Sequence, residues 1–472
     1  MADERIDTAR PGKTGEPDPP PFATAPAAVH HPPPPRTNNR RLLRLALLAP
    51  VVGAGAGVVD SLFRLALTRA DTWRNLLITR GHQAHLGGFC LVVTGCAMAV
   101  AFGAWLVKRF SPHASGSGIP QLEAALNGEL AGAPPRLLPV KFIGGLAAIG
   151  AGGALGREGP SVQMGAVVAH LVGRAFRHTP DELRLLLAAG AGAGIAVAFN
   201  APIAGAIFVL EELVRRFEPH MAIIALGASS TAILIFRLFL GNAPDFQVAI
   251  STQAAMATGP LPYASAATWP LYVGLGLFAG SAASLYNRSL LGAVSFAGRL
   301  SCLPVELKAA AIGALIGVVG WFFPALIGGG DTITQTMLAG GVAIGSIPFA
   351  FLVRFCLGPI SYAARTPGGL FAPLLVLGAQ LGLVSGALCR LAFPHLGISP
   401  EAFAVVGMAA FFTGVVQAPV TGIVLVTEMT AAFTTLLPML ASCFAAMLIA
   451  RLLRTTPIYD ALLARLIKER HS

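Results

Sequence analysis

Three glycine-rich turns are the segments of this chain whose residue types and spacing could do chemistry. They span Gly116–Pro120, Gly156–Pro160 and Gly369–Pro373. Glycine adopts backbone conformations that other residues avoid, and proline is favoured at the start of a helix, so each turn is expected to lead into a helix N-terminus. Such an end carries free N–H groups and about half a positive charge. Several of them meeting in an apolar surrounding predict a site for a small anion.

The composition predicts that this surrounding is a membrane. Hydrophobic residues make up 55% of the 472 residues, charged residues only 12%, and the mean hydropathy is +0.70. Charge-free runs cover residues 86–107, 221–236 and 434–450. Because a bilayer core takes about 20 helical residues, these runs are expected to be spanning or nearly spanning helices. We therefore expect an all-α integral membrane protein.

The two ends of the chain indicate its orientation. Ten prolines lie in residues 1–41, which end in Arg40 and Arg41, and Arg451, Arg454, Arg465, Lys468 and Arg470 follow the last apolar run. The excess of basic residues predicts that both termini are cytoplasmic. This topology explains most of the net charge of +11. A nucleic-acid partner is not expected, because no basic run is interleaved with aromatic residues.

An internal duplication is visible when the two halves are aligned. Four markers recur in the same order at offsets of 212 to 217 residues: Gly116–Gly118 with Gly328–Gly330, Val140–Gly145 with Val353–Gly358, Gly156–Pro160 with Gly369–Pro373, and Ala201–Ile207 with Ala418–Val424. Duplicated halves are typical of transporters and channels whose substrate lies where the repeats meet. If the repeats are inverted and both ends are cytoplasmic, the connector between them lies outside.

The resulting domain plan has five parts. We expect a disordered, proline-rich cytoplasmic tail at 1–41, a first membrane repeat at 42–240, an external linker at 241–269, a second membrane repeat at 270–455, and a cytoplasmic C-terminal helix at 456–472 that carries Tyr459. The glycine turns interrupt helices at membrane depth. Interrupted helices are tolerated only where the freed backbone lines a cavity, so their ends should face a pore.

Glu158 is the candidate gate. An isolated Arg157-Glu158 pair would more simply be an ion pair in a surface loop. Here an apolar, glycine-rich run precedes the pair and Pro160 follows it, so the carboxylate is expected at a helix N-terminus inside the membrane, where ionisable residues are rare and usually functional. When ionised, a carboxylate in that position can occupy the place of a small anion, and when protonated it can leave.

The motifs together resemble the CLC family of chloride channels and transporters. The resemblance rests on Gly116–Pro120, Gly156–Pro160, Gly368–Pro373 and Pro457–Tyr459, and it covers roughly residues 42 to 470. It implies about 18 membrane helices of uneven length, arranged as two inverted repeats with broken helices that meet at a central anion site. It also implies a homodimer with one pore per subunit in the inner (plasma) membrane of the cell, surrounded by lipid.

The resemblance implies which residues bind chloride. Ser117 and Tyr459 would donate hydroxyl hydrogen bonds, and the backbone near Gly118, Ile119, Gly159, Leu370 and Phe371 would complete the coordination. Neutral donors suit a halide that must also leave. Without the resemblance, Ser117 would be read as a turn residue and Tyr459 as a residue of the membrane interface. The serine, in place of the proline of nitrate-transporting relatives, favours chloride.

A second carboxylate bears on proton coupling. Proton-coupled CLC members have an acidic residue at the inner end of the helix that follows the first Ala-Pro motif, and Glu212 matches that position. Locally, Glu211 and Glu212 could equally form surface ion pairs with Arg215 and Arg216. The resemblance implies exchange of chloride for protons, with a passive voltage- or pH-gated chloride channel as the alternative. A membrane receptor or scaffold without transport is a more distant one.

The remaining charged candidates are expected to act electrostatically, without touching the ions; they are Glu123, Lys141, Arg157 and Glu211. An enzyme is not expected, because none of the ten histidines lies in a glycine turn. His82 and His85 have no carboxylate or cysteine beside them, and the six cysteines show no paired spacing. No metal or other cofactor is therefore expected.

Overall fold

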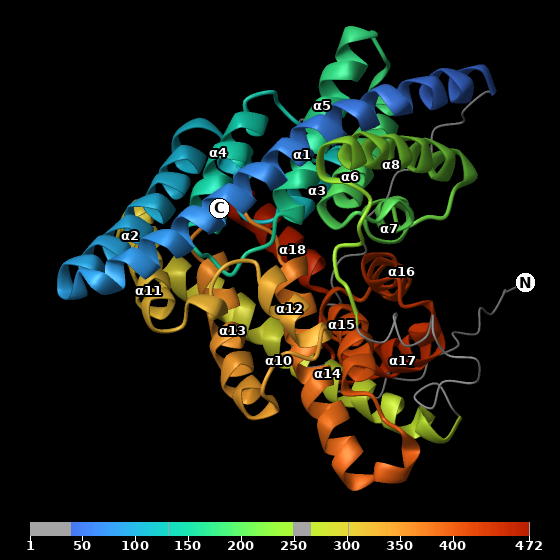
Figure 1. Cartoon of the computed structure of the whole chain (residues 1–472). Helices are drawn as coiled ribbons and strands as arrows, with labels where there is room; N and C mark the ends of the chain where they lie inside the picture. The colour runs from blue at the N-terminus through green and yellow to red at the C-terminus, as the bar shows by residue number, and fades with distance from the viewer. Residues whose placement is uncertain (1–38, 131, 249–265, 301, 472) are drawn as a thin grey trace, which may run out of the picture. The chain divides into compact units, whose positions relative to one another are not determined.

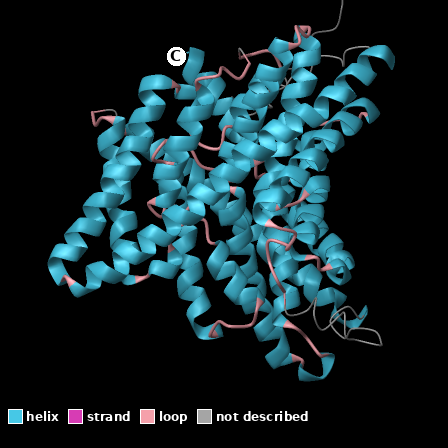
Figure 2. Ribbon diagram, turned by 45° about the horizontal axis from the view of Figure 1, so that its top comes forward, coloured by secondary structure: helices cyan, strands magenta, loops and turns pink. Residues whose placement is uncertain are grey.

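The computed structural model describes residues 39–130, 132–248, 266–300 and 302–471, and every regular element in these ranges is a helix. In the first half the α-helices are α1 (Asn39–Gln83), α2 (His85–Phe110), α3 (Ile119–Leu126), α4 (Leu137–Gly150), α5 (Glu158–Ala175), α6 (Pro180–Phe199), α7 (Pro202–Phe208) and α8 (Pro219–Leu240). Figure 1 shows their arrangement, and Figure 2 shows the helices joined by short loops.

The second half repeats this order. Its helices are α10 (Trp269–Arg299), α11 (Val305–Phe322), α12 (Asp331–Leu338), α13 (Ile347–Tyr362), α14 (Phe371–Ala392), α15 (Pro400–Val416), α16 (Pro419–Thr430), α17 (Leu436–Leu452) and α18 (Ile458–His471). Short single turns connect several of them, and a five-residue π-helical turn, Val209–Leu213, follows α7. The described residues thus contain 17 α-helices, close to the number expected.

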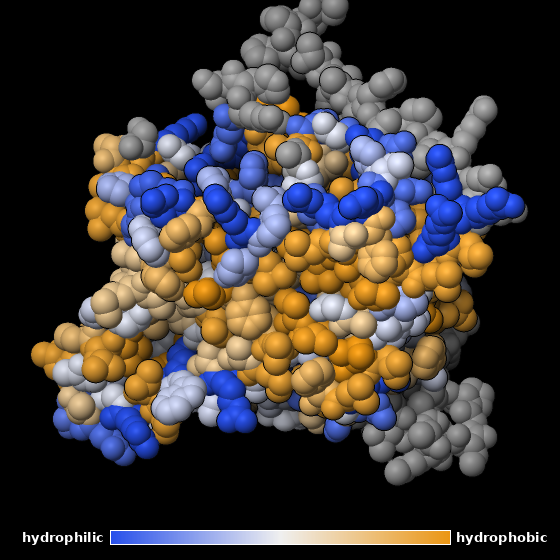
Figure 3. Space-filling model, turned by 90° about the horizontal axis from the view of Figure 1, so that it is seen from above, coloured by the Kyte–Doolittle hydropathy of each residue, from blue (hydrophilic) through white to orange (hydrophobic). Residues whose placement is uncertain are grey.

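Eight of the described helices are long and apolar enough to cross a membrane. They include α2, α8 and α17, which contain most of the three charge-free runs found in the sequence. Large apolar side chains such as Leu391 and Phe444 are more than two-thirds exposed. In Figure 3 hydrophobic residues form a broad band across the face in view, with most hydrophilic residues gathered along one edge. This surface is suited to lipid, as expected for an integral membrane protein.

Packing within the two halves supports the duplication. Helices α5 and α6 pack closely, as do α14 and α15. In the first pair a Cβ at Gly165 would overlap the carbonyl of Gly190, and in the second a Cβ at Gly378 would overlap the carbonyl of Gly407. Each crossing therefore needs glycine so that the backbones can touch. Gly165 corresponds to Gly378 and Gly190 to Gly407, at offsets of 213 and 217 residues that also relate the sequence markers of the two halves.

All three glycine turns lead into helices, as predicted. They precede α3, α5 and α14, and the break between α4 and α5 lies in the apolar stretch where the sequence indicated one. The domain plan is only partly covered. Helix α1 begins at Asn39, slightly before the expected start of the first repeat, while the expected tail up to residue 38 and linker residues 249–265 lie outside the described residues. The C-terminal helix is present as α18.

Candidate functional site

Backbone hydrogen bonds join the three turns. The N–H of Gly156 donates to the carbonyl of Gly369 over 2.9 Å, and the N–H of Gly369 donates back to Gly156 over 2.7 Å. Gly116 donates to Thr366 over 3.0 Å, and Gly368 donates to Gly116 over 3.1 Å. These bonds bring the N-termini of α3 and α5, from the first half, beside that of α14, from the second. The predicted convergence of helix ends is therefore present.

The Glu158 carboxylate lies where these ends meet. Its side chain is fully buried, and Oε1 accepts a hydrogen bond of 2.5 Å from the N–H of Phe371, the first residue of α14. Among the described residues Oε2 has no hydrogen-bond partner. A Cβ at Gly156 or Gly369 would overlap the carboxylate in this position, so a larger residue at either would displace it. Glu158 thus fills a place at a helix N-terminus that suits an anion.

The surface ion pair considered for Arg157 and Glu158 is not what the structure contains. The Arg157 guanidinium is directed away, donating to the carbonyl of Ala198 over 2.8 Å and pairing with Asp245 and Asp331 at 3.1 and 2.5 Å. Burial of Glu158 at a helix end therefore decides between the two interpretations. No local pattern pointed to Asp245 or Asp331, which are 88 and 174 residues from Arg157 along the chain.

The two predicted hydroxyl donors are both fully buried. The Ser117 hydroxyl accepts a 3.4 Å hydrogen bond from the N–H of Ile119. The phenol oxygen of Tyr459 has no hydrogen-bond partner among the described residues. Its ring centre lies 6.0 Å from that of Phe371. Packing of α18 against α3 therefore brings Tyr459 to the N-terminus of α14.

The backbone positions predicted to coordinate chloride line the same ends. Gly118, with φ of 82°, caps the N-terminus of α3, where Ile119 is the first residue. Gly159 is the second residue of α5, and a Cβ there would lie 2.6 Å from the Ser117 carbonyl oxygen. Leu370 and Phe371 lie at the start of α14 and are fully buried. All of these backbone groups belong to the three joined turns.

Lys141 and Arg354 are equivalent buried cations that hold turns in place. The Lys141 ammonium donates to the carbonyl of Gly116 over 2.8 Å. The Arg354 guanidinium donates to the carbonyls of Leu326, Gly328 and Gly329 over 3.0, 3.1 and 2.9 Å. Each thus fixes the turn that precedes a short helix, α3 or α12. The sequence repeat contained Arg354 opposite Lys141, so the repeat could have revealed it.

Glu212 lies in a second cluster of charges. It is 5% exposed, and its Oε1 has no hydrogen-bond partner in the described part of the chain. The neighbouring Arg215 donates from Nε to the Glu212 carbonyl over 3.3 Å and pairs with Glu123, at 3.3 Å, and with Asp460 of α18. Glu123 itself is 1% exposed. The interpretation of Glu211 and Glu212 as simple surface pairs with the following arginines is therefore wrong.

Glu211 has a structural contact of its own. Its carboxylate accepts from the N–H groups of Val420 and Thr421 over 3.1 and 2.6 Å, and from the Thr421 hydroxyl over 2.7 Å. These residues begin α16 in the second half. Glu211 therefore caps a helix across the repeat interface.

No group of three or more His, Cys, Asp or Glu side chains with metal-binding geometry occurs among the described residues. His82 instead lies 3.1 Å from the carbonyl oxygen of Trp321. The six cysteines are free thiols. The chemistry that this site supports is the binding of anions by neutral donors and the exchange of protons on buried carboxylates.

Similarity to known proteins decides the family. A family model described as voltage gated chloride channel matches residues 97–451. The chain belongs to this family. It is 36% identical over 433 residues to the H(+)/Cl(-) exchange transporter ClcA of Salmonella arizonae, covering 90% of this chain and 89% of that protein. Identity to ClcA of Cronobacter sakazakii is also 36%, over 441 residues and 91% of each chain.

Solved structures show the same relationship. A slow cyanobacterial Cl-/H+ antiporter superposes with a TM-score of 0.85 at 31% identity, covering 92% of this chain and 100% of that one. A CLC-type fluoride/proton antiporter gives a TM-score of 0.73 at 22% identity, over 90% of this chain and 98% of that one. The second likeness concerns the fold alone. The fold of the chain is therefore that of CLC transporters.

Proposed function

We propose that this protein exchanges chloride for protons across a membrane, with Glu158 as gate and proton acceptor. The observation that carries the proposal is the hydrogen bond from the Phe371 N–H to the Glu158 carboxylate, at the point where helix ends from both halves meet. Membership of the family and the ClcA relatives support the choice of ions.

The gate works by competition for the same donors. An ionised Glu158 accepts from Phe371 and keeps chloride out of the N-terminus of α14. Protonation removes the charge that this helix end attracts, so the side chain leaves and chloride takes its place. Ser117 and Tyr459 then donate hydroxyl hydrogen bonds to the dehydrated ion. Return of the carboxylate expels chloride and releases the proton.

Glu212 delivers protons to the gate from the cytoplasm in this mechanism. Its burial and its unpaired oxygen support this role, because a buried carboxylate without a dedicated partner can take up and give up a proton. Arg215, paired with Glu123 and Asp460, supplies positive charge beside it. Chloride does not pass this cluster.

The expected topology and assembly form part of the proposal. Both termini are cytoplasmic in an inner membrane, so the linker residue Asp245, which pairs with Arg64 and Arg157, lies on the outer side with the gate. The protein forms a homodimer with one pore per subunit. Exposed apolar side chains on α8 and α17, such as Leu234 and Phe444, offer a surface for a second copy.

Liposomes containing the purified protein test the function. A chloride gradient should drive protons in the opposite direction, recorded simultaneously with chloride and pH electrodes. Chloride movement without any proton movement would indicate a passive chloride channel instead of an exchanger. Absence of both movements would favour a receptor or scaffold.

A further inference from the structure

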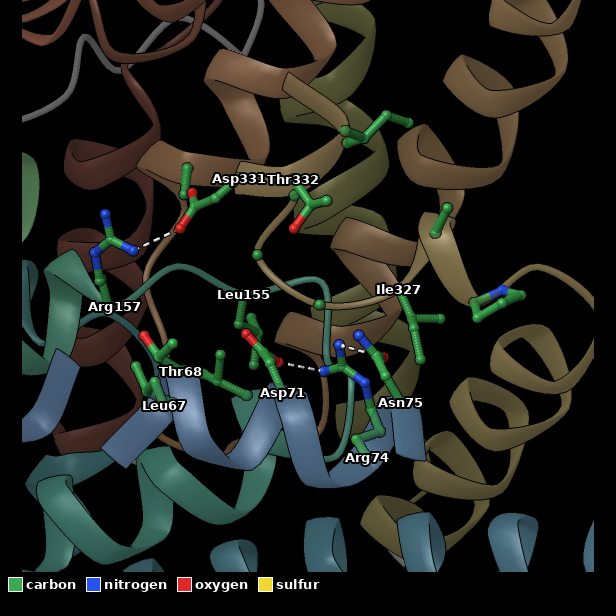
Figure 4. Close-up of a pocket in the computed structure, with 18 of the residues that line it drawn as sticks. Leu67, Thr68, Asp71, Arg74, Asn75, Leu155, Arg157, Ile327, Asp331 and Thr332 are labelled. Carbon is green, nitrogen blue, oxygen red and sulfur yellow. Dashed lines mark hydrogen bonds and ion pairs between the residues drawn. The ribbon is translucent and has the colours of Figure 1, made fainter. Parts of the chain in front are cut away.

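A cavity with several charged side chains in its wall opens at the turn before the gate. It has a volume of about 550 Å³ and is lined by the second half of α1, the turn through Gly156 and Arg157, and the turn from Gly328 to Asp331. Figure 4 shows Arg157 and Asp331 meeting across it, with Asp71 and Arg74 paired on the α1 side. Arg157, the residue before Glu158, lines this cavity.

Arg157 has two acidic partners of different character. Asp245 is 4% exposed and also pairs with Arg64 at 2.9 Å, so it is held firmly from two sides. Asp331 has a side chain that is 48% exposed, and it accepts a hydrogen bond of 2.5 Å from Arg157. Because water reaches the Asp331 carboxylate, although the Arg157 side chain is only 15% exposed, this ion pair contributes little to stability. The Asp331 carboxylate can therefore be displaced, whereas Asp245 remains.

We propose that the Asp331 carboxylate competes with chloride for the Arg157 guanidinium, at the outer entrance of the chloride pathway. An incoming chloride displaces it and is held at Arg157, one residue from Glu158. Because Asp331 competes for Arg157, chloride binds this entrance more weakly. A chloride ion bound there can therefore leave Arg157 and pass toward Glu158. This inference rests on the proposed function.

Its position on the arginine next to Glu158 distinguishes Asp331 from the other acidic residues of the cavity. The Asp71 side chain is as exposed, at 47%, and pairs with Arg74 at 2.5 Å, but that pair lies on the α1 side of the cavity. Asp245 pairs with both Arg64 and Arg157, so its single negative charge does not compensate both guanidinium groups. Removing the charge of Asp331 leaves positive charge uncompensated in a confined cavity, which raises the local concentration of anions.

The test is Asp331→Asn, measured by radioactive chloride uptake in right-side-out and inverted membrane vesicles at constant ionic strength. The variant should lower the half-saturating chloride concentration about two- to fivefold on the outer face, the range that a half-exposed ion pair supports, with no change on the inner face. Asp331→Glu keeps the charge and should match the wild type. Thr332→Val, which changes an exposed neighbour in the same cavity, should do so too.

An unchanged half-saturating concentration in Asp331→Asn, or an equal change on both faces, overturns the inference. An equal change in Thr332→Val does so as well, since it would trace the effect to the shape of the cavity rather than to charge. Chloride uptake decides the matter even if no protons move, so failure of proton exchange and failure of this inference are separate results. Gel filtration and a thermal unfolding curve establish that each variant is folded.

Discussion

Glu211 and Glu428 each cap the N-terminus of a helix that belongs to the opposite half of the molecule. Glu211, after α7, accepts from the first backbone N–H groups of α16, and Glu428, near the end of α16, accepts from Ile203 and Ala204 at the start of α7 over 3.1 and 2.8 Å. The two glutamates are separated by the 217-residue offset of the repeat. The duplication thus extends to individual hydrogen bonds, and two short helices are held by charge supplied from the opposite half.

This reciprocal capping should contribute measurably to stability. Replacing Glu428 by Gln removes a charge that two helix N–H groups share, so we expect a loss of about 1–2 kcal/mol and a lower thermal unfolding midpoint in detergent. Glu211→Gln should behave alike, because its two backbone hydrogen bonds are equivalent to those of Glu428. Asp181→Asn, at an exposed position in the first turn of α6, is the control and should change little. Equal midpoints for all three variants would refute the capping role.

Replacing Glu158 by Gln should abolish proton coupling while chloride still passes. The neutral side chain cannot change charge, so it cannot exchange places with chloride as a proton arrives and leaves. Chloride and proton fluxes recorded on the same liposomes give the result directly. Glu306→Gln, a surface change paired with Lys108 at 2.8 Å, serves as control. Proton pumping at the wild-type ratio in Glu158→Gln would sink the assignment.

Replacing Glu212 by Gln should keep chloride flux and remove proton flux. In our proposal Glu212 handles protons only, so its neutral analogue interrupts their route without touching the anion site. The measurement is chloride efflux and proton uptake from one vesicle preparation. A variant in which both fluxes fall together would indicate a structural role for the cluster around Arg215, and one with both fluxes intact would remove Glu212 from the mechanism.

Replacing Ser117 by Pro should shift selectivity from chloride toward nitrate. Proline removes the hydroxyl donor, and it also removes the N–H that Ser117 donates to the Tyr362 phenol over 3.4 Å. A hydrogen bond to a charged group is worth about 1.5–3 kcal/mol, so chloride binding should weaken roughly tenfold or more, whereas the less strongly hydrated nitrate should lose less. Isothermal titration with both anions measures the change.

Ser117→Ala separates the two effects of that substitution, because it removes the hydroxyl and keeps the backbone N–H. It should weaken chloride binding by a similar factor without stiffening the turn. An unchanged ratio of chloride to nitrate affinity in both variants would mean that Ser117 is only a turn residue.

The sequence by itself determined the features that depend on local backbone chemistry. Glycine followed by proline marked the starts of α3, α5 and α14, and uninterrupted apolar runs marked α2, α8 and α17. The aligned halves indicated the duplication. These signals are readable because each arises from neighbouring residues, through the conformations that glycine and proline favour or through the length of chain that a bilayer requires.

Only the tertiary structure decided which partners the charged residues have. Arg157 pairs with Asp331, 174 residues away, and Arg215 pairs with Asp460, 245 residues away. Each arginine has a nearer acidic neighbour along the chain, so the local pattern also allowed surface pairs with Glu158 and with Glu211 and Glu212. Folding instead buries Glu158 at a helix end and Glu212 inside a charged cluster, and it places the Glu211 carboxylate at the start of α16. Such contacts depend on how the two halves pack, and no local pattern encodes that geometry.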